Sequence, residues 1–189
     1  MKLSLKIIGC LGLAAFATIS SSVYAAETKT NTLLYISPND YKYSVHLLHP
    51  YYDYWFTQGP LVEPIALQAL QAKDAELKMC SGNETANTII RIKPSLFYNP
   101  QLRMYHSKLE ATVYSGGGSV LGSYVGEAQQ LGFTSVDTGT QYHIKKVYTL
   151  AMRDLMTKLQ INVPESAKSE TKLPCGLIGG QEQPKVNFY

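Results

Sequence analysis

The stretch that decides the fold is "TIIRIKPSLFYNPQLRMYHSKLEATVYSGGGSVLGSYVGEAQ", residues 88–129. Near its start Ile90 and Ile92 alternate with charged residues, and residues 108–113 alternate in the same way. A period of two is expected for antiparallel strands with one buried face. Residues 115–119, "SGGGS", suit a flexible hairpin connection. The stretch therefore predicts a meander of three antiparallel strands.

Apolar patterns outside the meander predict the rest of the domain. "NTLLYI", residues 31–36, is typical of a strand, and residues 37–40, "SPND", of a turn. Residues 61–79 and 141–159 each carry a single apolar stripe at helical spacing. Two such helices can cover one face of a half-polar sheet. We expect a two-layer α+β fold: an antiparallel sheet of about four strands with two helices on one face, in the order β-α-β-β-β-α.

The N-terminus, "MKLSLKIIGCLGLAAFATISSSVYAAET", has the layout of a secretory signal peptide, with cleavage after Ala25. Its apolar run is shorter than the roughly 20 residues that span a bilayer, and no later segment is long enough. We expect residues 1–25 to be removed and the processed chain to lie in the periplasm without a transmembrane span. The alternative is a lipid anchor on Cys10, because Ile8-Gly9-Cys10 resembles a lipoprotein attachment box.

Charge and length limit the possible classes of protein. The full chain has a formal charge of 17 − 14 = +3, and loss of two lysines with the signal peptide leaves 15 − 14 = +1. Nucleic-acid binding normally needs a basic patch, so this balance argues against it. The remaining 189 − 25 = 164 residues suffice for one domain. We expect a single α+β domain over residues 26–163 and a polar C-terminal tail over residues 164–189.

Two cysteines, Cys80 and Cys175, remain after cleavage. An exported protein with an even number of cysteines is a candidate for a disulfide, which here would tie the tail to the middle of the chain. The alternative is a pair of buried free thiols. Neither alternative gives the two cysteines a catalytic role.

Aromatic residues crowd into "HLLHPYYDYWFTQGP", residues 46–60. Tyrosine and tryptophan combine a large apolar area with a polar group, which suits contact surfaces. We therefore take Tyr51, Tyr52, Tyr54 and Trp55 as the candidate ligand or partner contacts. The alternative is a hydrophobic lid packed over the end of the sheet, and the sequence does not separate the two.

Catalytic patterns are weak in this chain. Ser119 and Ser123 do not satisfy G-x-S-x-G. The alternative function that can be named is a small metal-assisted envelope hydrolase using His46, His49 and Asp53, whose side chains converge only if the backbone turns between them. We expect a protein that is not an enzyme, with no catalytic residue, no metal site and no cofactor.

The pattern of "LLYISP", the meander with "VYSGGG" and the closing helix "VYTLAMRDLMTKL" resembles small Gram-negative envelope proteins of the transport-auxiliary and YajG-like lipoprotein type. The resemblance covers residues 31–161 and implies an α/β fold without enzymatic activity and an accessory or assembly role at the periplasm or outer membrane. Those families carry a lipobox cysteine just before the processed chain, which the predicted cut here lacks. No family site residue can be transferred.

Together these patterns predict an exported periplasmic accessory or binding protein of the cell envelope. Its partner would be an envelope protein or an apolar ligand, and a structural subunit of an envelope complex is a further possibility. Neither the identity of the partner nor the oligomeric state follows from the sequence.

Overall fold

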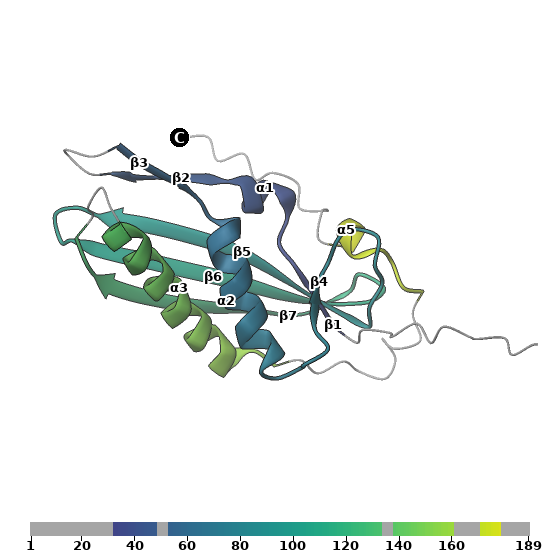
Figure 1. Ribbon diagram of the computed structural model, residues 1–189. Coiled ribbons are helices and arrows are strands. Elements are labelled where there is room, and N and C mark those ends of the chain that lie inside the picture. The colour runs from purple at the N-terminus through teal and green to yellow at the C-terminus, as the bar shows by residue number, and fades with distance from the viewer. Residues whose placement is uncertain (1–31, 49–52, 134–137, 161–170, 179–189) are drawn as a thin grey trace, which may run out of the picture.

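The computed structural model describes residues 32–48, 53–133, 138–160 and 171–178. Its main sheet has five strands in the order β4-β1-β5-β6-β7 (Figure 1). The strands are β1 (Thr32–Tyr35), β4 (Lys78–Met79), β5 (Thr88–Asn99), β6 (Met104–Ser115) and β7 (Val120–Leu131). The predicted signal peptide and Cys10 lie outside the described residues.

The predicted meander is confirmed. Strand β5 pairs antiparallel with β6, and β6 pairs antiparallel with β7. Ile90 lies opposite Val113 and Ile92 opposite Ala111, so the apolar residues of both strands share one face. The glycine turn is closed by a bond from Ser115 N to Ser119 O of 2.8 Å.

The prediction of a four-stranded, purely antiparallel sheet is wrong, because the sheet has five strands and is mixed. Strand β1 runs parallel to both β5 and β4. The chain leaves β1, passes through a helix that covers the sheet, and re-enters beside β1 in the same direction, as crossover connections do. Strand β4 has two residues, too few to give a periodic pattern in the sequence.

Helices α2 (Gly59–Gln71) and α3 (Thr138–Lys158) cover one face of this sheet, as predicted (Figure 1). Helix α2 ends eight residues earlier than expected, 79 − 71 = 8. The backbone N–H groups of Lys73 and Asp74 both bond to Leu70 O in a turn, which leads the chain to β4.

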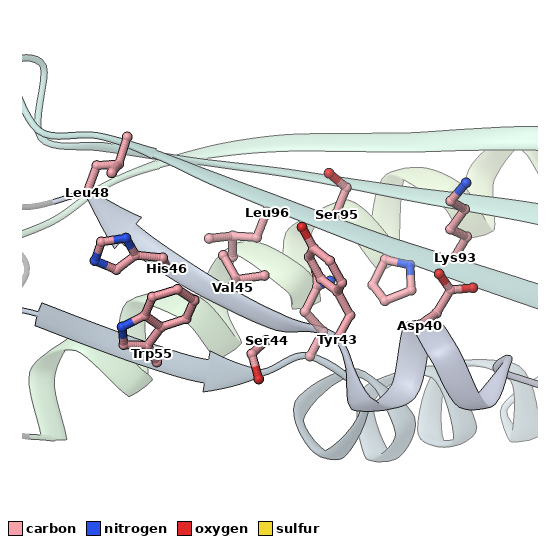
Figure 2. Close-up of a pocket in the computed structure, with 12 residues that line it drawn as sticks. Asp40, Tyr43, Ser44, Val45, His46, Leu48, Trp55, Lys93, Ser95 and Leu96 are labelled. Atoms are coloured by element: carbon pink, nitrogen blue, oxygen red, sulfur yellow. The ribbon is translucent and has the colours of Figure 1, made fainter. Parts of the chain in front are cut away.

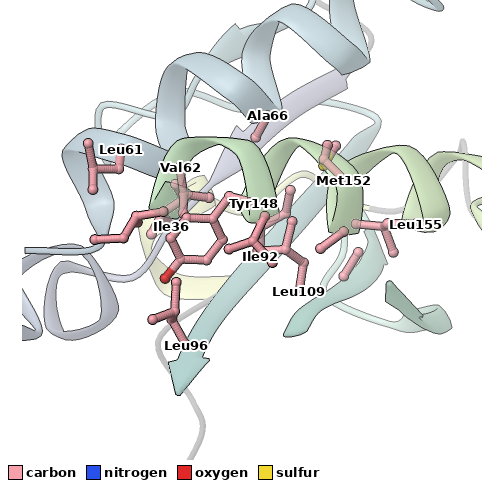
Figure 3. Packing of buried hydrophobic residues seen from close by; sticks show 14 of the residues in the cluster. Ile36, Leu61, Val62, Ala66, Ile92, Leu96, Leu109, Tyr148, Met152 and Leu155 are labelled. Atoms are coloured by element: carbon pink, nitrogen blue, oxygen red, sulfur yellow. The ribbon is translucent and has the colours of Figure 1, made fainter. Parts of the chain in front are cut away.

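The main core fills the space between the two helices and the sheet. Val62, Leu109, Tyr148 and Met152 are buried there beside other aliphatic side chains (Figure 3). The Tyr148 hydroxyl donates a hydrogen bond of 2.7 Å to Oε1 of the buried Gln58, just before α2. Burial raises the pKa of Tyr148 far above its ordinary value, so this hydroxyl stays protonated as a donor.

A smaller core lies on the opposite face of the sheet. Helix α5 (Cys175–Ile178) packs there against Leu33, Tyr35 and Ile89, whose neighbours in sequence point to the main core. Cys80 and Cys175 are joined as a disulfide, with their Cα atoms 6.1 Å apart. Part of the segment predicted as a polar tail thus returns to the sheet.

A separate hairpin, β2 (Ser44–Leu48) with β3 (Asp53–Thr57), stands beside β5 (Figure 1). Residues 37–40, predicted as a turn, instead form the N-cap and the first three residues of the short helix α1 (Pro38–Lys42), where Ser37 Oγ accepts a bond from Asp40 N. Strand β1 pairs with β5 only as far as Arg91. Beyond Arg91 no strand among the described residues pairs with that edge of β5, and the hairpin lies beside it.

Candidate functional site

The hairpin divides the aromatic stretch between two environments. Val45, Leu47 and Phe56 are buried in the main core, and Tyr54 is partly buried against it. Trp55 is 57% exposed, because successive side chains of a strand point to opposite faces. The stretch is therefore both a lid and a surface: alternate residues close the core and face the solvent.

On its outer face the hairpin carries a connected group of His46, Asp53 and Trp55, which we call the hairpin cluster. The antiparallel register places His46 directly opposite Trp55, and their rings stack with centroids 4.4 Å apart and planes 8° apart. Asp53 Oδ1 accepts a bond of 2.7 Å from Trp55 Nε1 and lies 2.8 Å from His46 Nε2. One carboxylate thus fixes both rings in a flat aromatic platform.

The platform borders a cavity of about 610 Å³ between the hairpin and β5, which we call the hairpin cavity (Figure 2). His46, Trp55 and the 61% exposed Tyr43 supply its rings. Lys93 and Ser95 line it from the face of β5 that points away from α2 and α3. The size falls within the range of small-molecule sites in proteins, about 300 to 1,000 Å³.

Polar groups of the hairpin cavity are partly held in place. Asp40 Oδ2 accepts a bond of 2.7 Å from Ser37 Oγ and lies 3.5 Å from an Arg91 guanidinium nitrogen. Gln58, which also lines the cavity, accepts the bond from Tyr148 described above. The lining of the cavity therefore combines aromatic faces with oriented polar groups and is not purely apolar.

A second hollow of about 270 Å³ continues along the same face of the sheet. Ser95 lines both hollows, and Phe97 and His106 lie beyond it with ring centroids 5.8 Å apart. Phe97 is exposed although its neighbours in β5 are buried. An elongated ligand lying in the hairpin cavity can therefore extend along β5.

The residues predicted as contacts are only partly placed. Trp55 borders the cavity, Tyr54 turns toward the core, and Tyr51 and Tyr52 lie outside the described residues. Sequence reasoning missed Tyr43, which lies between α1 and β2, and Lys93 and Ser95, which both lie on β5. The sequence shows that Lys93 and Ser95 alternate with apolar residues along the strand. It does not show that the hairpin lies over them.

Among the residues of the metal-assisted alternative, the hairpin brings His46 and Asp53 together, and His49 lies outside the described residues. The Nε2 and Oδ1 atoms that would hold a metal contact each other at 2.8 Å. A second grouping joins Glu84 to the two cysteines, with ligand atoms within 4.8 Å of one another. Sulfurs joined in a disulfide are not thiolate ligands, so this grouping suits a covalent link better than a metal.

Of the described helices, none combines the length and the apolar character needed to cross a bilayer.

No protein-family model matches the chain, and no curated protein matches it. A candidate lipoprotein of Caulobacter crescentus is a similar solved structure, at 10% sequence identity and a TM-score of 0.36, over 53% of this chain and 78% of that one. A similarity this loose does not assign a family, so the site itself must carry the functional argument.

Proposed function

We propose that this protein is an exported, non-enzymatic accessory protein of the Gram-negative envelope that binds a ligand in the hairpin cavity. The observation that carries the proposal is the hairpin cluster, an exposed aromatic platform already held in place beside a ligand-sized hollow. A preorganised platform loses little side-chain freedom when a ligand binds, which favours affinity.

The lining favours a polyhydroxylated ligand, such as an envelope glycan, over a purely apolar one. Sugar rings present C–H faces that pack on aromatic rings, and hydroxyls that bond to carboxylate, ammonium and hydroxyl groups. Trp55 and Tyr43 offer the first kind of contact, and Lys93, Ser95 and Asp40 the second. The continuing hollow along β5 would accommodate a chain of more than one sugar.

The two carboxylates near the hairpin cavity, those of Asp40 and Asp53, are both bonded to neighbouring side chains. Asp40 is held by Ser37 and Arg91, and Asp53 by His46 and Trp55. Both carboxylates orient side chains of the site, and such preorganisation favours binding.

The test is calorimetric titration of the purified protein with soluble peptidoglycan fragments and with a panel of neutral oligosaccharides. Tyr43→Ala and Trp55→Ala should each weaken binding by about fivefold or more, since truncating an aromatic side chain at the centre of a contact costs about 1 kcal/mol or more. Tyr142→Ala is the matched control, because Tyr142 is 60% exposed on α3. Binding that survives both cavity variants, or its absence for every glycan, contradicts the proposal.

The export proposal has a separate test. Intact mass of the protein recovered from cell fractions should begin at Ala26 in the periplasmic fraction. A membrane-fraction mass beginning at a diacylated Cys10 would make the protein a lipoprotein and refute free periplasmic release.

A further inference from the structure

A second surface, on the outer side of the helical layer, has no part in the proposed function. Helices α2 and α3 do not close against each other there, and leave a groove of about 480 Å³. Its apolar lining comes from Ile65, Ala69 and Ala72 on the α2 side and from Met152 and Met156 on α3. We call this the helix groove.

The groove has the dimensions and chemistry of a helix-binding site. Ala72 follows Ile65 by seven positions, a rise of about 10 Å, so the groove is about two helical turns long. Small alanines on one wall permit close approach of another backbone. On the other wall the half-buried thioether of Met156 can adapt to the side chains of a partner, and the buried Met152 closes the floor.

Positive charge surrounds the groove. Lys73 and Arg153 line it, and a neighbouring hollow of about 480 Å³ on α3 adds Lys145 and Lys146. Neither lining contains an acidic residue. Among the described residues no ion pair involves any of these four cations. The rim therefore carries four positive charges.

The acid beside them on α3 does not neutralise this rim. Asp154 Oδ2 lies 2.6 Å from Lys158 Nζ and accepts a bond of 2.9 Å from Glu127 N on β7. Its carboxylate is directed to the sheet edge. At the end of the groove, Lys73 Nζ donates to Met156 O at 3.0 Å, linking the two walls.

We propose that the helix groove binds an amphipathic helix with acidic flanks, presented by a partner protein. Charge complementarity selects acidic flanks, and the two-turn apolar floor selects a helix with apolar residues at i, i+3 or i+4, and i+7. An anionic membrane fits less well, because Met152 is 1% exposed and lies at the floor. A lipid surface is contacted by apolar side chains that protrude, whereas this apolar surface is recessed.

The probe is a panel of synthetic peptides of about 20 residues, long enough to be helical. Each carries leucine or methionine on one face and glutamate on the flanks, and the controls have the same composition in scrambled order or lysine in place of glutamate. Methionine methyl NMR locates the binding, because Met152 and Met156 line the groove whereas Met79 and Met104 do not. The expected result is a shift of the first two signals alone, for the acidic amphipathic peptides alone.

A charge-reversal pair supplies the second arm. Lys145→Glu with Lys146→Glu should weaken binding about tenfold, and Lys42→Glu with Lys78→Glu, which changes the net charge equally at exposed sites elsewhere, should not. Each of three results overturns the proposal: no binding across the panel, equal loss in both double variants, or binding to phosphatidylglycerol vesicles that moves the same methyl signals while the peptides do not.

Discussion

Removal of the Cys80–Cys175 link is the perturbation whose size can be worked most directly from the structure. The two cysteines are 95 residues apart in sequence. In the chain-entropy model a link that closes a loop of this length stabilises the folded state by about 4.7 kcal/mol. Cys80→Ala with Cys175→Ala should therefore lower the free energy of unfolding by about 4 to 5 kcal/mol.

The location of the link indicates which part of the fold depends on it. Cys175 is fully buried in the small core with Leu33, Ile89 and Ile178. Residues near it are also bonded to the sheet end, by Leu173 N to Gly116 O at 2.8 Å. Because these contacts are few, α5 should detach from the sheet in the double variant, while the main core keeps its structure.

The assay is urea unfolding, followed by Trp55 fluorescence and by circular dichroism. With a slope of about 2 kcal/mol per molar, the midpoint should fall by about 2 M. Reductant should lower the stability of the wild-type protein to a similar extent and leave the alanine variant unchanged. A loss below about 1 kcal/mol, together with insensitivity of the wild type to reductant, would show that the cysteines are not linked in the folded protein.

Three further substitutions test the packing that supports the site. Tyr148→Phe leaves Gln58 Oε1 buried without its donor and should cost about 1 to 3 kcal/mol in chemical denaturation, whereas an unchanged midpoint would mean that Gln58 finds another partner. Gly126→Ala should cost about 1 to 3 kcal/mol in the same assay, because a Cβ there would overlap the backbone of α3 at Ala151, and a neutral effect would contradict this close packing. In thermal unfolding Phe56→Ala should cost about 3 to 5 kcal/mol and Trp55→Ala less than about 1, and equal losses would refute the division of the hairpin into inner and outer faces.

The meander and the long helix α3 could be predicted from sequence because their information is local. Alternation along β5 and β6 directly reports the buried face of each strand, and the stripe on α3 that includes Ile144 and Leu155 is buried as expected. Parallel pairing of β1 was not predictable in this way. It depends on a crossover whose end point, the two-residue β4, has no periodic pattern.

The site was predicted less well than the fold because it is assembled from distant segments. The aromatic stretch drew attention to Trp55, but the cavity also needs Tyr43 and, from β5, Lys93. The sequence posed lid or contact surface as a choice for the whole stretch, whereas a strand sends alternate residues to the core and to the solvent. The register of β2 with β3, which joins His46 to Trp55, becomes known only from the paired structure.

The most direct test of the central claim uses the fact that Trp55 is the only tryptophan of the chain. Its indole N–H gives a single side-chain NMR signal, from the group that donates to Asp53. Titration with soluble peptidoglycan fragments should shift this signal in a saturable manner, and Tyr43→Ala should weaken binding by about fivefold or more. An indole signal that stays in place while backbone signals elsewhere move would show that the hairpin cavity is not the binding site.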